Sequence, residues 1–176
     1  MDFGEVPVRF HAHLEALIAE ASETLAAGEE VMATIYLGRA DSDELTPFFY
    51  NTSSDEMRER SVLFARALAM SLPADFVLVV SEAWSIARDD PNDPQEIFKK
   101  YGSLSNYPGR IDCLSIVIES HQEGIWMMQI PIETSSAKSS KPPRRRLGAA
   151  PNIMRPVAGE GRLIGILPPA SGAARH

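Results

Sequence analysis

Apolar side chains in the first part of the chain follow the spacing of an α-helix. Phe10, Leu14 and Leu17 begin a series of apolar residues separated by three or four positions. This period gives a helix one apolar stripe, so it predicts a helix over residues 8–27. Gly28 follows directly and is expected to end the helix with a positive φ angle.

A strand and a second helix are predicted next. Residues 30–37 alternate in the manner of a strand whose two faces are both at least partly covered. Residues 47–50 fit either a short strand or a packed loop, and the pattern does not choose between them. The segment Ser53-Ser-Asp-Glu56 has the order of a capping box, which predicts a helix to about Ser71. The side chains that this helix is expected to bury include Met57, Phe64 and Leu68.

The clearest strand pattern lies in residues 75–84. An unbroken apolar run from Phe76 to Val80 predicts a central strand that is covered on both faces. Asp93 is then placed as the N-cap of a short helix over residues 94–101, with proline at its first position.

Two further apolar runs, residues 111–119 and 125–132, predict an antiparallel hairpin. The resulting order of helices and strands predicts an α+β fold. We expect a mainly antiparallel sheet of four to five strands, with the two long helices packed on one face.

The composition changes towards the C-terminus. No aromatic residue follows Trp126, and six of the 13 prolines lie in residues 142–169. Because aromatic side chains contribute heavily to core burial, this part is not expected to build a core of its own. The sequence therefore predicts a compact domain over residues 1–133 and an extended, flexible tail over residues 134–176, rich in Pro, Gly and Ser.

The charge changes sign at about the same place. Residues 1–137 hold 23 Asp and Glu against 9 Lys and Arg, whereas residues 138–176 hold 8 Lys and Arg against a single acid. Three explanations of the basic cluster stay open: contact with nucleic-acid phosphates, contact with the acidic domain of the same or a neighbouring chain, and a solvated linker. The cluster consists of Lys138, Lys141, Arg144, Arg145 and Arg146.

A small apolar island at residues 162–167 stands out in the tail. It is bounded by glycine and proline, and it is expected to add a strand to a sheet edge of this molecule or of another. Its expected contact residues are Leu163, Ile164 and Ile166.

Several functional classes are disfavoured by the residue inventory. A single cysteine excludes an intramolecular disulfide and a multi-cysteine zinc site. His11 and His13 would lie on different sides of the predicted helix, so they cannot share a metal. We expect no cofactor and no metal. The lack of a signal-peptide pattern and of any long apolar run predicts a cytoplasmic protein without a membrane partner.

One segment could carry chemistry. On the predicted strand, Glu82 and Trp84 continue the apolar row of one face, and a carboxylate in such a row needs a partner or a raised pKa. Glu82 is thus a catalytic acid beside an aromatic wall, half of a structural ion pair, or an acid at the strand end that reaches solvent. Arg110 and Asp112, two apart at the start of a later strand, supply the hypothesis of a Glu82–Arg110 pair beside Trp84.

The Ser-Glu-Ala-Trp segment, followed by an acidic loop and a Pro-x-Arg-x-Asp segment at residues 108–112, resembles small uncharacterised bacterial and phage-encoded α+β proteins. The resemblance covers about residues 75–132. It implies a microbial or phage source and no particular activity.

These observations favour a non-enzymatic interaction or regulatory protein, in which the basic tail contacts a protein partner or another copy of the chain. Two alternatives stay open: a hydrolase-type enzyme that uses Glu82 near Trp84, and a nucleic-acid-binding protein that uses the basic tail.

Overall fold

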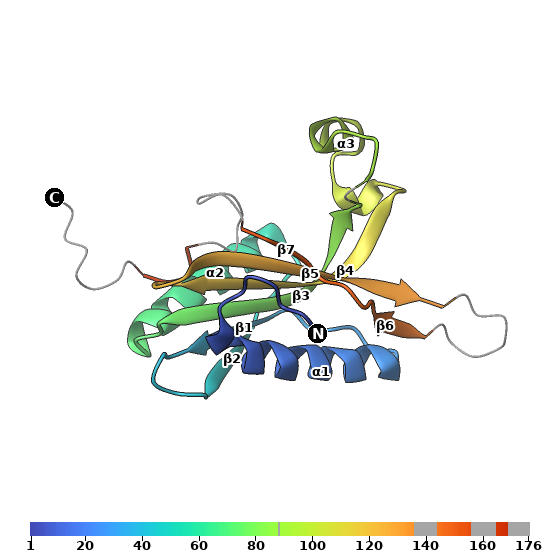
Figure 1. Cartoon of the computed structure of the whole chain (residues 1–176). Helices are drawn as coiled ribbons and strands as arrows, with labels where there is room; N and C mark the ends of the chain where they lie inside the picture. The colour runs from blue at the N-terminus through green and yellow to red at the C-terminus, as the bar shows by residue number, and fades with distance from the viewer. Residues whose placement is uncertain (88, 136–143, 156–164, 169–176) are drawn as a thin grey trace.

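The computed structural model describes residues 1–87, 89–135, 144–155 and 165–168. These residues form three α-helices, seven strands and two short 3₁₀ turns (Figure 1). In chain order the helices and strands are α1 (His11–Ala27), β1 (Thr34–Gly38), β2 (Leu45–Phe49), α2 (Asp55–Ser71), β3 (Phe76–Ile86), α3 (Pro94–Tyr101), β4 (Arg110–Ser120), β5 (Gly124–Thr134), β6 (Arg145–Leu147) and β7 (Asn152–Met154).

The strands form one curled antiparallel sheet. Its order is β2-β1-β3-β4-β5-β6, and β7 also pairs with β5. The α+β class and the antiparallel pairing are therefore confirmed, as is the β4–β5 hairpin. The expected four to five strands are too few, because β2 is a strand and because two short strands come from the C-terminal part of the chain.

The prediction of two long helices on one face is wrong, because α1 and α2 cover opposite faces of the sheet. Alternate residues of a strand point to opposite faces. In β3, Leu78 packs in the core beneath α1, whereas Val77 and Val79 pack in the core beneath α2. The unbroken apolar run of this strand is explained by these two covers.

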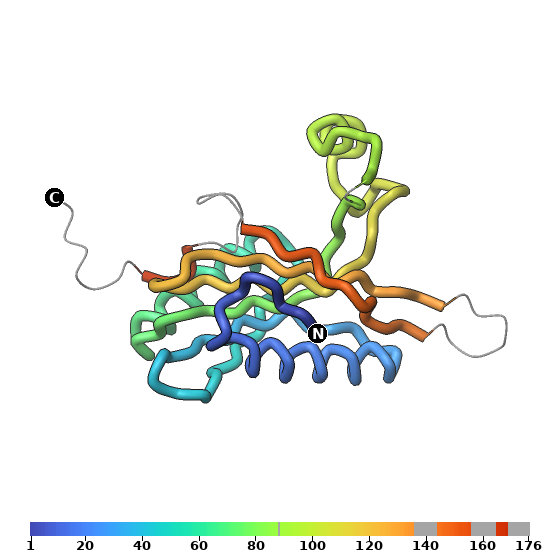
Figure 2. Tube along the Cα trace, in the orientation of Figure 1, coloured from blue at the N-terminus to red at the C-terminus, as the bar shows by residue number. Residues whose placement is uncertain are grey.

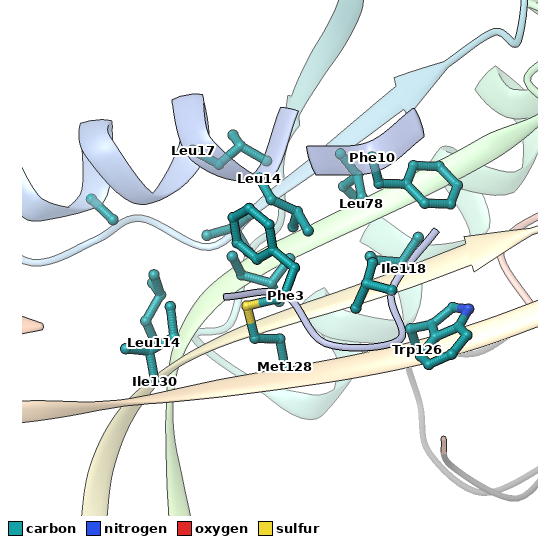
Figure 3. Close-up of a cluster of buried hydrophobic side chains, with 14 of the residues drawn as sticks. Phe3, Phe10, Leu14, Leu17, Leu78, Leu114, Ile118, Trp126, Met128 and Ile130 are labelled. Atoms are coloured by element: carbon teal, nitrogen blue, oxygen red, sulfur yellow. The ribbon is translucent and has the colours of Figure 1, made fainter. Parts of the chain in front are cut away.

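The core on the α1 side joins the N-terminal segment to the centre of the sheet (Figure 3). Phe10 and Leu14 are fully buried there, and Phe3, near the start of the chain, is 3% exposed. The residues labelled in Figure 3 are Phe3, Phe10, Leu14, Leu17, Leu78, Leu114, Ile118, Trp126, Met128 and Ile130.

The core on the α2 side is built differently, because α2 turns small residues to the sheet. Ala65 and Ala69 are fully buried, whereas Phe64 is 55% exposed and contacts Phe48 of β2 with ring centroids 4.9 Å apart. The expectation that Phe64 is buried is wrong. Small side chains let the helix approach the sheet closely, and the aromatic ring packs at the edge instead.

Gly28 and Asp93 cap α1 and α3 as predicted, whereas α2 begins one residue later than the Ser53–Glu56 capping box implies. Gly28 ends α1 with φ +83°, and its N–H donates to the carbonyl of Leu25. The Ser54 hydroxyl accepts from the N–H of Met57 at the start of α2. The Asp93 carboxylate caps α3 in the same manner. Each cap satisfies backbone groups that a helix leaves unpaired.

The C-terminal part of the chain contributes to the domain in two places. Residues 145–147 and 152–154 pair one after the other along the outer edge of β5, and Figure 2 shows this part of the chain running beside β5. Residues 165–168 lie against the α2 side of the sheet, where Ile166 is fully buried. Contact of the tail with its own domain was one of the alternatives left open by the sequence, although residues 165–168 pack on a face of the sheet and do not add a strand to its edge.

An arm projects from one end of the sheet (Figure 1). Its stem is the paired ends of β3 and β4, from Ser81 opposite Ser115 to Ile86 opposite Arg110, and its tip carries α3. The Tyr107 hydroxyl donates to the Asp90 carboxylate at 2.6 Å. This hydrogen bond lowers the pKa of Asp90 and raises the pKa of Tyr107.

Candidate functional site at the open edge of β3

The candidate site lies where the neighbours of β3 separate. The pairing of β1 with β3 ends at Thr34 and Val80, although β3 continues to Ile86. The chain before β1 stays with β2 instead, since the N–H of Tyr50 donates to the carbonyl of Ala33 at 2.8 Å. Beyond Val80, β3 therefore has β4 on one side and no paired strand on the other among the described residues.

A pocket of about 840 Å³ lies where the chain before β1 separates from β3. Three segments line it: residues 30–33 before β1, residues 49–53 after β2, and residues 81–84 of β3. Arg58 of α2 and Asp112 of β4 complete the wall. Met32 and Phe49 are each 65% exposed, and Trp84 is 46% exposed. Large apolar side chains are thus left in contact with solvent around an unpaired strand edge.

Glu82 fixes one side of the pocket. Its Oε1 accepts from the N–H of Val31 at 2.8 Å and from Nη1 of Arg145 at 3.1 Å, and its Oε2 accepts from Nη2 of Arg145. The two side chains are 25% and 21% exposed, and Glu82 raises the pKa of Arg145. One carboxylate therefore ties the strand to the chain before β1 and to β6.

The hypothesis of a Glu82–Arg110 pair is wrong, because Arg145 takes that place. Arg110 donates instead to the carbonyl of Ser105, and its guanidinium lies 5.8 Å from the centre of the Trp84 ring. Asp112 is opposite Trp84 in the β3–β4 pairing and is exposed. The structure thus brings the four motif residues to one end of the sheet with a different ion pair.

The basic cluster of the tail is partly within the described residues. Arg145 pairs with Glu82, and Arg146 pairs with Glu133 of the neighbouring strand at 2.8 Å. The backbone N–H of Arg144 donates to the Ser135 hydroxyl. The ion pairs are contacts with the acidic domain of the same chain, one of the three explanations considered from sequence. Lys138, Lys141, Leu163 and Ile164 lie outside the described residues.

Sequence reasoning missed two of the three segments that form the pocket. Residues 30–33 and 49–53 carry no chemical motif. They line the pocket with β3 because the chain before β1 stays bonded to the end of β2 and separates from β3. The exposed Phe49 at the end of the proline-containing strand β2 was the available signal. Arg145 was predicted as a contact residue from its charge, but no local pattern pairs it with Glu82.

Glu82, the candidate acid predicted from the sequence, has both oxygens engaged by an arginine that stays charged. Among the described residues no group of three or more His, Cys, Asp or Glu side chains could hold a metal ion. Cys113 is buried in β4, and burial raises the pKa of its thiol, which disfavours a thiolate.

Comparison of the chain with protein-family models, curated proteins and solved structures finds no match. The microbial or phage source implied by the Ser-Glu-Ala-Trp segment stays a prediction. No helix in the described part of the chain is long and apolar enough to cross a membrane.

Proposed function

We propose that this chain is a non-enzymatic interaction protein that binds an extended segment of a partner protein at the open edge of β3. The observation that carries this proposal is the unpaired edge beyond Val80 with a pocket of about 840 Å³ beside it. An extended peptide that pairs with such an edge gains main-chain hydrogen bonds, and its alternate side chains enter the adjoining pocket.

The side chains around the edge define the partner. Trp84, Phe49 and Met32 offer exposed apolar surface to one of its side chains. Exposed aromatic residues that border a pocket are typical anchors of binding energy at protein interfaces. The lining carries the carboxylates of Glu30 and Asp112, and its one arginine, Arg58, donates to Asp55 and to the carbonyl of Thr52. The two carboxylates therefore favour a basic residue in the partner segment.

The proposed contact surface is the open edge of β3 and not the basic tail expected from the sequence. The tail arginines Arg145 and Arg146 are paired with acids of the same chain, so they build the site instead of reaching outward. Arg145 holds Glu82, and Glu82 holds the backbone of Val31 at the pocket wall. A rigid wall lowers the entropy cost of ordering a bound peptide.

Selection from a library of random 12-residue peptides against the full chain tests the proposal. We expect enriched peptides to alternate apolar and polar residues and to include a basic residue. Trp84→Ala should weaken their binding by about tenfold or more, because a buried aromatic anchor contributes 2 kcal/mol or more. Phe98→Ala is the matched control, because Phe98 is 50% exposed on α3 and does not line the pocket. Enriched peptides that bind both variants equally would contradict the proposal.

A further inference from the structure

A second peptide-like contact lies on the other side of the sheet and is already occupied. Residues 165–168 lie on the surface formed by α2, β4 and β5, and they belong to no helix or strand. Ile166 is fully buried and Leu167 is 7% exposed. Both pack in one apolar cluster with Val62 and Ala65 of α2 and Val117 of β4.

Side chains of the domain hold the backbone of this segment. One oxygen of Glu119 accepts from the N–H groups of Gly165 and Ile166, at 3.0 and 2.8 Å. Arg66 of α2 donates from Nε to the carbonyl of Gly165 at 2.8 Å. His121 lies with Nε2 2.7 Å from the carbonyl of Pro168, so Nε2 carries the donated proton.

The Glu119 carboxylate is specialised for this task. It is half-buried at the end of β4, and burial raises its pKa, an effect that the backbone N–H donors of residues 165–167 oppose. A buried carboxylate that accepts several main-chain N–H bonds is a common means of fixing a peptide backbone, since each bond is charge-assisted. The domain therefore binds the segment through its main-chain N–H groups and through the two apolar side chains of Ile166 and Leu167.

The geometry also sets the sequence that fits. Gly165 has φ +83°, a conformation that other residues adopt only with strain. Two apolar residues follow and are buried, and Pro168 supplies the last bonded carbonyl. The surface thus accepts a segment that begins with glycine and two apolar residues, followed by a residue that contributes only its carbonyl.

We propose that the surface formed by α2, β4 and β5 is a binding site for a partner peptide of this pattern, which residues 165–168 occupy in the free protein. The segment is held by side-chain contacts and not by a strand ladder, so its release costs less than unfolding of the sheet. A partner peptide binds when the segment leaves, and its apparent affinity falls by the fraction of molecules in which the surface is open. This site is separate from the open edge of β3.

Two release variants of the full chain test the proposal. Gly165→Val strains the segment without changing the surface beneath it, since a Cβ there would meet only Arg66 Nη2 at 3.7 Å. Ile166→Asp removes the main apolar contact. The probe is a fluorescein-labelled peptide with the sequence of residues 162–169, Arg-Leu-Ile-Gly-Ile-Leu-Pro-Pro. We expect both variants to bind it at least about tenfold more tightly than the unaltered chain.

Control variants distinguish specific binding of the peptide at this surface from nonspecific binding elsewhere on the protein. In the Gly165→Val background, Glu119→Ala should abolish binding, whereas Glu119→Gln should retain most of it because the amide oxygen still accepts hydrogen bonds. Trp84→Ala should leave binding unchanged, because it alters only the β3 edge. Equal weak binding by all three chains, or binding that Glu119→Ala does not affect, overturns the proposal.

Hydrogen exchange on the unaltered chain gives a result that does not depend on the folding of any variant. The amides of Gly165 and Ile166 should exchange at least about tenfold faster than the slowest amides of β4, because the segment opens locally. Exchange of both amides at the rate of the slowest β4 amides would show that the segment leaves only on global unfolding. That result overturns the proposal as well.

Discussion

The ion pair between Glu82 and Arg145 predicts a measurable loss of stability when either partner is removed. The two side chains are 25% and 21% exposed, and Glu82 also accepts the N–H of Val31. Breaking a fully buried pair costs about 3–5 kcal/mol, whereas exposed pairs contribute about 0–1 kcal/mol. For this partly buried, doubly hydrogen-bonded pair we expect Glu82→Ala to lower the free energy of unfolding by about 2–3 kcal/mol.

A double-mutant cycle isolates the pair. Glu82→Ala, Arg145→Ala and the double variant are unfolded with urea at neutral pH, and the coupling energy should be about 1–2 kcal/mol. The neighbouring pair of Glu133 and Arg146 supplies a matched control, because its side chains are 52% and 79% exposed. Its coupling should stay below about 0.5 kcal/mol. Equal coupling energies for the two pairs would show that partial burial does not strengthen the Glu82–Arg145 pair. An unchanged melting temperature for Glu82→Gln would contradict the predicted stabilisation as well.

Three further outcomes are expected. Truncation after Thr134 should lower the free energy of unfolding by about 3 kcal/mol or more in urea titrations, since it removes two strands and the buried Ile166; an intact melting transition would contradict this. Asp90 has a pKa lowered by the Tyr107 hydroxyl, so its stabilisation is present above its ordinary pKa of 3.8 and is lost as the pH falls through the lowered value. The melting temperature should therefore fall less in acid for Tyr107→Phe than for the unaltered chain, and equal falls would contradict this. Gly38→Ala should cost about 1–3 kcal/mol by thermal unfolding, because its Cβ would lie 2.2 Å from the Phe76 ring, and an unchanged melting temperature would contradict the overlap.

Local patterns predicted the three helices and the strands β3, β4 and β5. The apolar stripe of α1, the cap of α3 and the β4–β5 hairpin all depend on neighbours close in sequence. The five apolar residues that begin β3 also indicated cover on both faces. That observation conflicts with both helices lying on one face, and the structure resolves the conflict by placing one helix on each.

The contacts made by the C-terminal part of the chain were beyond such reasoning. Strands β6 and β7 have three residues each, too few for a period, and β6 contains two arginines. The abrupt change of charge left three explanations open, one of them contact with the acidic domain of the same chain. The particular partners of the arginines, Glu82 and Glu133, depend on contacts that only the folded chain creates. The candidate pocket could not be predicted for the same reason, since the separation of β1 from β3 arises only in the folded chain.

The edges of the sheet bear on how this protein assembles. At one end, edge strand β2 contains Pro47, which supplies no N–H to an incoming strand. At the other end, β6 and β7 are short and separated by residues 148–151. Both features discourage one molecule from adding to the next along the sheet. In the described part of the chain, the stretch of β3 beyond Val80 is left without such protection. A polymer grows only when each molecule offers two binding edges. A complex that forms through the one open edge of this chain should therefore stop at two molecules and not extend into fibres.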